Sequence, residues 1–146
     1  NGQTSYNNGF STVTPLRVAI GNNNLSIVKF LVEKGADINM RNGHFGETPL
    51  IDAVNAKNAS IVKYLLEKGA NTGLATYGGG GPTTPLIIAI NNSEIEIIKL
   101  LILHKAKVNQ KLDVYGTALD CALRSESPKK AEIIRILKEA GARSGN

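Results

Sequence analysis

The side chains with the greatest chemical reactivity in this chain are two histidines, His44 and His104, and one cysteine, Cys121. A protein metal site needs several convergent ligands, and these residues do not occur at the spacing of zinc ligands. Cys121 falls in an apolar pattern, where a thiol behaves as a small core residue and is usually inert. Because no acid, base and nucleophile form a recognisable set, the sequence predicts no metal, no cofactor and no enzymatic activity.

A run of four glycines follows Tyr77 and ends at Pro82. Glycine-rich loops can hold phosphate groups, but the phosphate-binding loop ends in Gly-Lys-Ser/Thr, whereas this run leads into Pro82-Thr83-Thr84. The run therefore predicts a flexible or unusually shaped loop. A functional alternative stays open, in which Tyr77 at the tip of this loop docks onto a partner, because tyrosine is enriched in interface hot spots.

The charge pattern argues against nucleic-acid and membrane partners. The 146 residues carry a net charge of +5, and only 5% of them are aromatic. Nucleic-acid binding calls for a basic stripe with stacking aromatics, and a membrane span needs about 18 consecutive apolar residues; the sequence has neither. The basic residues recur instead at one phase of a repeated helix, which predicts a solvated face; they include Lys29, Lys34, Lys63, Lys68, Lys99 and Lys138.

One tripeptide organises the whole chain. Thr-Pro-Leu begins at Thr14, Thr48 and Thr84, and Thr-Ala-Leu begins at Thr117, so the spacings are 34, 36 and 33 residues. A period of this length is typical of a solenoid of stacked repeats. The Thr side chain suits a helix N-cap, and Pro suits the first helical position because it has no N–H to leave unpaired.

Each tripeptide opens a short helix and is followed by a longer one. The short helices carry apolar residues at i, i+3 and i+4, as in Leu16, Ala19 and Ile20, which predicts one buried face. The longer apolar segments, such as Ile27–Val32, end in Gly-Ala in three copies, where Gly favours the left-handed residue after a helix. Lys105 replaces this Gly in the third copy, and a left-handed Lys105 is expected to cost about 1–2 kcal/mol.

These motifs together resemble the ankyrin repeat. Thr-Pro-Leu-x-x-Ala, an aliphatic helix and then Gly35-Ala36-Asp37-x-Asn39, repeated at about 33 residues, match the period and signature of that family. The resemblance implies an all-α solenoid of helix-turn-helix units with β-hairpin-like connecting loops, called fingers below. It also implies a single domain, residues 1–146, whose repeats span approximately residues 9–42, 43–76, 77–110 and 111–143.

The sequence departs from the family pattern at several positions. The usual His after Thr-Pro-Leu is absent from every copy; its place is taken by Arg17, Ile51, Ile87 and Asp120. Asp52 stands in a column that is otherwise apolar, which predicts either a hydrogen bond to a neighbouring turn or a buried acid at some cost in stability.

The two ends of the repeat array differ in polarity. Terminal repeats need polar outer faces, and the last helix has them, with Lys130, Glu132, Arg135, Lys138 and Glu139. At the other end, two alternatives stay open: the first repeat is itself the cap, or a preceding unit is missing. In the second case, Val18 and the neighbours of Phe30 should be more exposed than a cap tolerates.

The resemblance also implies a binding groove between the fingers and the ends of the first helices. By the family pattern, the candidate finger residues are His44, Phe45, Glu47, Tyr77 and Tyr115. The candidate residues at the ends of the first helices are Asn22, Asn55, Asn92 and Arg124. An alternative for each aromatic ring is that it packs on its own hairpin.

The function implied is that of a protein–protein interaction module that binds another protein through this groove as a monomer. The alternative is a regulatory or scaffold segment of a larger enzyme or secreted effector. The expected location is cytoplasmic, or secreted or periplasmic if a signal segment preceded Asn1.

Overall fold

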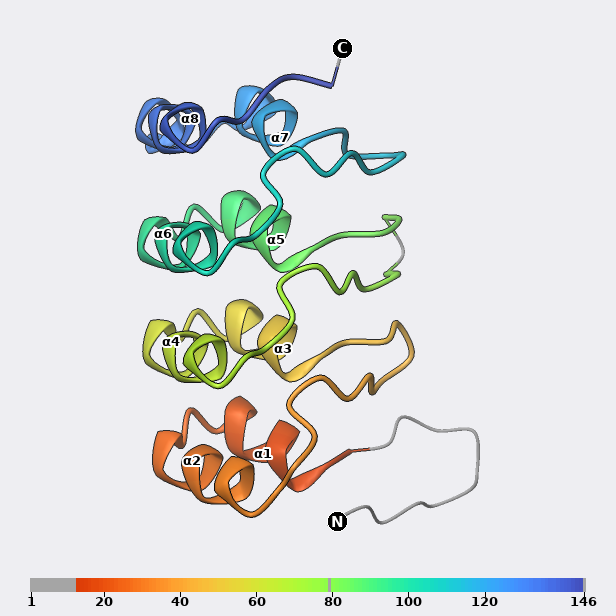
Figure 1. Cartoon of the computed structure of the whole chain (residues 1–146). Coiled ribbons are helices and arrows are strands. Elements are labelled where there is room, and N and C mark those ends of the chain that lie inside the picture. Colours follow the sequence, from red (N-terminus) through yellow and green to blue (C-terminus); the bar gives the residue numbers. More distant parts are fainter. Residues whose placement is uncertain (1–12, 79, 146) are drawn as a thin grey trace.

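The computed structural model describes residues 13–78 and 80–145, and these residues form a stack of helix pairs (Figure 1). In each pair a short helix is followed by a longer one. The described part of the chain holds eight helices: α1 (Pro15–Gly21), α2 (Leu25–Glu33), α3 (Pro49–Asn55), α4 (Ala59–Glu67), α5 (Pro85–Asn91), α6 (Ile95–Leu103), α7 (Ala118–Arg124) and α8 (Lys130–Glu139). The predicted helix pairs are confirmed.

The short helices begin where the Thr-Pro-Leu motif predicts. Thr14 Oγ1 accepts a hydrogen bond from Arg17 N at 3.2 Å, and Thr48 and Thr84 cap α3 and α5 in the same way. Proline occupies the start of α1, α3 and α5. Each cap satisfies one backbone N–H that the first turn of a helix leaves without an intrahelical partner.

The turns between paired helices use left-handed residues that are not glycine. Asn23, Lys57 and Ser93 have φ between 54° and 56°. The next residue, Asn24 or Asn58, then caps the longer helix through its side-chain oxygen. At the far end of the longer helices, Gly35, Gly69 and Gly141 have positive φ. Lys105, which replaces this Gly in the third copy, has φ 67° and is therefore left-handed.

Hairpin-like fingers connect successive pairs. Isolated antiparallel bridges join Asn42 to Glu47, Thr76 to Thr83 and Leu112 to Gly116. Figure 1 shows these fingers projecting on the side of α1, α3, α5 and α7, away from the longer helices. The stack therefore places the fingers and the short helices next to one another along the array, and the predicted hairpin-like connections are confirmed.

One aliphatic core runs through the stack from Leu16 to Ala142. Its regular columns include Ile61, Ile97 and Ile133, which are no more than 1% exposed. Cys121 is buried in the same core, as predicted, and its burial raises the pKa of its thiol. Aliphatic side chains of this kind stabilise the stack by removing apolar area from water.

Candidate interaction surface

Two finger aromatics are exposed, and one is not. Phe45 is 46% exposed and Tyr77 is 60% exposed, whereas Tyr115 is half-buried and packs against the core. Tyr115 thus packs against the core, and the alternative that each ring packs on its own hairpin stays a prediction. The apolar side chain that this finger exposes is instead Val114, the residue before it.

The fingers that carry Phe45 and Tyr77 are fastened to each other. Tyr77 N and Thr76 Oγ1 both donate to Phe45 O at 2.8 Å. Arg41 Nη1 donates to Ala75 O at 2.8 Å, and the Arg41 guanidinium carbon lies 5.9 Å from the Tyr77 ring centroid. The two aromatic residues therefore belong to one hydrogen-bonded patch, which limits the conformational freedom that binding would remove.

Tyr115 and Val114 lie against the glycine run of the preceding finger. A Cβ atom on Gly80 would contact the Tyr115 hydroxyl, and one on Gly81 would lie 2.9 Å from Val114 Cγ2. Gly81 also has φ 98°, a conformation that favours glycine. These glycines thus permit close approach of two fingers, which the sequence alone did not reveal.

The four residues predicted to line the groove at the ends of the short helices do not occupy equivalent positions in their helices. Asn55 and Arg124 are the last residues of α3 and α7, whereas Asn22 and Asn92 are C-caps one position beyond α1 and α5. The counterparts of Asn55 in those helices are Gly21 and Asn91. Asn22, Asn55 and Arg124 are exposed and Asn92 is half-buried. Arg124 Nη2 donates to Tyr115 O, which ties its guanidinium to the base of a finger.

A charged cluster links the first two helix pairs at the base of the fingers. Arg17 Nε lies 3.2 Å from Asp52 Oδ2, and Arg17 Nη2 lies 3.8 Å from Glu47 Oε1. Burial raises the pKa of Asp52 to about 6 against the attraction of Arg17, and the Glu47 charge raises it further. The alternative of an acid buried at some cost therefore agrees with the raised pKa of Asp52, whereas its partner is no turn but Arg17 of α1, the residue that replaces the motif His one repeat earlier.

His44 and Glu47 flank Phe45 at the tip of its finger. The His44 ring is exposed, and its centroid lies 6.3 Å from that of Phe45 at a tilt of 55°. Phe45 N donates to Glu47 Oε2 at 3.4 Å. Glu47 therefore braces the finger while it also faces Arg17, so this tip combines an aromatic ring, a histidine and an acid.

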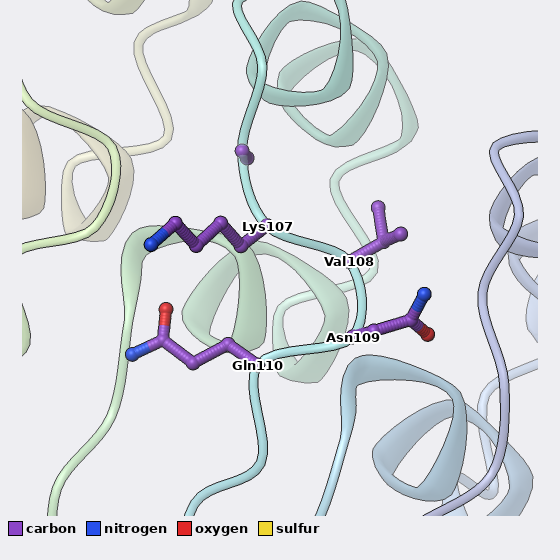
Figure 2. Close-up of a pocket in the computed structure, with 5 residues that line it drawn as sticks. Lys107, Val108, Asn109 and Gln110 are labelled. Atoms are coloured by element: carbon purple, nitrogen blue, oxygen red, sulfur yellow. The ribbon is translucent and has the colours of Figure 1, made fainter.

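Two hollows among the described residues have little capacity for chemistry. One, of about 690 Å³, is lined by Ala106, Lys107, Val108, Asn109 and Gln110. Figure 2 shows that Lys107 and Gln110 extend to one side of this loop while Val108 and Asn109 extend to the other. Asn109 also bonds Gly141 O and Arg143 N within the fold. These side chains do not converge on one point.

The part of the chain that the structure describes contains neither a cluster of metal ligands nor a helix that could span a membrane. Residues 13–78 and 80–145 contain no group of three or more His, Cys, Asp or Glu side chains arranged to hold a metal ion. In the same part of the chain, every helix is too short or too polar to cross a membrane.

The comparison with protein families decides the classification. A family model described as ankyrin repeats (3 copies) matches residues 2–76 and residues 74–145. The chain belongs to the ankyrin-repeat family. Ankyrin repeats are generally protein–protein interaction modules and are typically non-catalytic. The chain matches no curated protein.

Proposed function

We propose that this ankyrin-repeat chain binds a protein partner through its fingers and the ends of its short helices. The observation that carries the proposal is the patch formed by Phe45 and Tyr77, two exposed rings on fingers that share backbone hydrogen bonds. Large aromatic side chains on a rigid support contribute most to binding because they bury much area and lose little conformational entropy.

The polar surroundings of the patch suit an uncharged or mixed-charge partner. Asn22, Asn55 and Asn92 offer amide donors and acceptors, while His44, Glu47 and Arg124 add groups of both signs. The proposal includes no catalysis and no oligomer.

The lysines support a protein partner over nucleic acid. Lys29 and Lys68 each place Nζ 5.7 Å from the Tyr64 ring centroid, and Lys34 does the same over Phe30. Lys29 lies in α2, and Lys34 and Lys68 are the C-caps of α2 and α4. Figure 1 shows these longer helices on the opposite side of the stack from the fingers. A basic stripe beside the exposed aromatics would be needed for single-stranded nucleic acid.

Selection from a random peptide display library would test the proposed surface. Peptides would be selected on the unaltered chain, and their affinity would be measured for Phe45→Ala and Tyr77→Ala. We expect each change to weaken binding by about ten-fold or more, as for an aromatic hot spot, with the melting temperature nearly unchanged because both rings are exposed.

Leu103→Ala is the matched control, because Leu103 is an exposed apolar residue at the end of α6, outside the fingers. It should leave peptide affinity unchanged. Selected peptides that bind both finger variants as tightly as the unaltered chain would reject the surface described above.

The alternative is that the chain serves as a regulatory or scaffold segment of a larger enzyme or secreted effector. One observation favours it: the first helix pair exposes Val18, Ile27 and Phe30 at the end of the stack. A unit that continues the array is one way to cover such residues.

A further inference from the structure

The longer helices end on the same residue type except in the third pair. α2, α4 and α8 end on Glu33, Glu67 and Glu139, whereas α6 ends on Leu103. Leu103 is 71% exposed, more than any other large apolar side chain in residues 13–78 and 80–145. Stacking does not require an apolar side chain at this position, because the other three pairs carry a glutamate there.

The same exchange leaves a lysine without its acid. In α4, Lys63 Nζ lies 4.0 Å from Glu67 Oε1, and the end of α8 has the same i, i+4 pair of charges. The equivalent cation of α6 is the exposed Lys99, four residues before Leu103. The Lys99 side chain has no hydrogen bond or ion pair with another described residue, including Glu96 one turn earlier. α6 therefore presents an unpaired cation and an apolar side chain one turn apart.

Lys99 and Leu103 line a hollow between α6 and α8. The hollow has a volume of about 490 Å³, and its apolar lining also includes Ile102, Ile136 and Ala140. α6 and α8 are neighbours on the side of the stack away from the fingers (Figure 1). α8 packs less closely on α6 than α6 packs on α4. It also follows a longer connection, residues 125–129, than the one that precedes α6, residues 92–94.

The charges around the hollow favour an acidic occupant. Two cations, Lys99 and Arg135, and one carboxylate, Glu139, line it. Arg135 Nη1 already lies 2.9 Å from Glu139 Oε1, so Lys99 is the group that remains to be paired. A partner carboxylate beside Lys99 would take the place of the glutamate that ends the other longer helices, and an apolar side chain next to it would cover Leu103.

A helix suits this hollow better than an extended segment. Its walls are two helices, whose backbone N–H and C=O groups bond within each helix and offer no edge to a strand. An extended segment buried there would leave its own backbone groups without partners, whereas a helix pairs them internally. Lys99 and Leu103 are separated by about 6 Å along the axis of α6, and residues four apart on a partner helix have the same spacing.

We propose that the hollow between α6 and α8 is a second interaction surface, which binds an acidic amphipathic helix of a partner protein. A Glu or Asp of that helix pairs with Lys99. An apolar residue one turn away packs on Leu103 and Ile136, as when an amphipathic helix lays its apolar face in a groove. This surface is separate from the fingers, and its binding does not depend on theirs.

A synthetic helical peptide serves as the probe. Glu and Leu alternate at successive turns of one face, with Ala elsewhere, in a peptide of about 20 residues, long enough to form helix in water. A matched peptide carries Gln in place of each Glu. Fluorescence anisotropy measures the affinity of the whole chain for each peptide. We expect the Glu peptide to bind at least about three-fold more tightly, as for a partly exposed ion pair.

Two variants place the peptide in the hollow. Leu103→Glu gives α6 the residue that ends the other longer helices, and it should weaken binding of the Glu peptide by about ten-fold or more. Its melting temperature should stay nearly unchanged, because this position is exposed. Lys99→Gln should remove the preference for the Glu peptide and leave the affinity for the Gln peptide unchanged, which a general loss of structure would not do.

Lys63→Gln is the matched control. Lys63 has the equivalent position in α4, but it is paired with Glu67 and has no exposed leucine one turn later. This variant should bind both peptides as the unaltered chain does. Library peptides that bind the fingers should respond in the opposite way from the Glu peptide, weakened by Phe45→Ala and unaffected by Leu103→Glu.

Four results would overturn the proposal. One is a Glu peptide that does not bind, or that binds no more tightly than the Gln peptide. Another is undiminished binding of the Glu peptide to Leu103→Glu. The third is a loss of its affinity for Phe45→Ala, which would place the peptide on the fingers. The fourth is a dimer of the chain in sedimentation equilibrium that Leu103→Glu abolishes, because a second copy would then cover the hollow.

Discussion

The first and last helix pairs are built from the same motif but end the stack differently. At the first pair, Ile27 and Phe30 are exposed, and Lys34 Nζ lies 5.7 Å from the Phe30 ring. At the last pair, α8 is polar on its outer side, with Lys138 and Glu139 exposed, although Leu123 of α7 is exposed too. Burial therefore depends on position in the stack, since Ile61 is covered by a preceding pair and the equivalent Ile27 is not.

The last pair has a second feature that the first lacks. Ser144 Oγ donates to Asp120 Oδ1 at 2.5 Å, and Gly145 N donates to Asp120 Oδ2 at 3.0 Å. Thr117 N also donates to Asp120 Oδ2, at 2.8 Å, in a capping box. Residues 143–145 thus lie against the first turn of α7 and are held there by a buried carboxylate.

The largest expected difference is between the first pair and the interior of the stack, and it concerns one isoleucine column. Ile61→Ala should lower the free energy of unfolding by about 2–5 kcal/mol, because it leaves a cavity in the core. Ile27→Ala should lower it by less than about 1 kcal/mol, since that side chain is already half in water. Urea denaturation of both variants measures the two losses in the free energy of unfolding. Equal losses would show that Ile27 is covered in solution and that the two positions do not differ in burial.

A smaller effect is expected from the carboxylate of Asp120 in the last helix pair. The Ser144 hydroxyl, with backbone N–H groups of Thr117 and Gly145, holds the pKa of Asp120 well below its usual range. The ionised Asp120 therefore stabilises the fold fully when the pH is above its ordinary pKa of 3.8, and this stabilisation is lost as the pH falls below that value. Asp120→Asn should cost about 1–3 kcal/mol at pH 7, and chemical denaturation should show the difference shrinking between about pH 4 and pH 2.

Asp52, in α3 of the second helix pair, provides the control because its pKa is shifted in the opposite direction. Burial favours the protonated acid in the fold, so stability falls as the pH rises from 3.8 through about 6. Asp52→Asn should therefore gain about 1–3 kcal/mol relative to the unaltered chain between pH 3 and pH 7. Parallel pH trends in the two variants would contradict the opposite environments found for these acids.

The smallest expected effect is a local one at Lys105, at the end of the third helix pair. Lys105 has φ 67°, whereas Gly35, Gly69 and Gly141 occupy the same place in the other pairs. Lys105→Gly should raise the free energy of unfolding by about 1 kcal/mol, because relief of the left-handed strain exceeds the added flexibility of the unfolded chain. Thermal melting of the variant measures this gain; a lower melting temperature would show that the lysine side chain contributes contacts.

Much of the fold was predictable because its causes are local. Thr14, Thr48 and Thr84 cap their helices with their own hydroxyls, and the glycines after the longer helices mark their ends. The left-handed Asn23, Lys57 and Ser93 were not predicted, because none is glycine. Their conformation is held by the turns, which also contact one another along the stack, as in Asn58 to Asn23.

The candidate surface was predictable only in part. The exposure of Phe45 and Tyr77 agrees with their placement on fingers, whereas Tyr115 packs inward against the core and Gly80 of the preceding finger. Asn22 and Asn92 also lie one position beyond the column of Asn55, because the Asn-rich sequence does not show where each short helix ends. Their role in binding stays a prediction.

By itself, the sequence determined the repeat, the helix pairs and the family, because caps, apolar spacing and turn glycines act within a few residues of where they stand. Only the tertiary structure decided which copy of a repeated residue is buried and which acid binds its proton more tightly. Ile27 and Ile61 share one local sequence, and Asp52 and Asp120 share one ordinary pKa. They differ because stacking brings different neighbours to each, and burial and electrostatics depend on those neighbours.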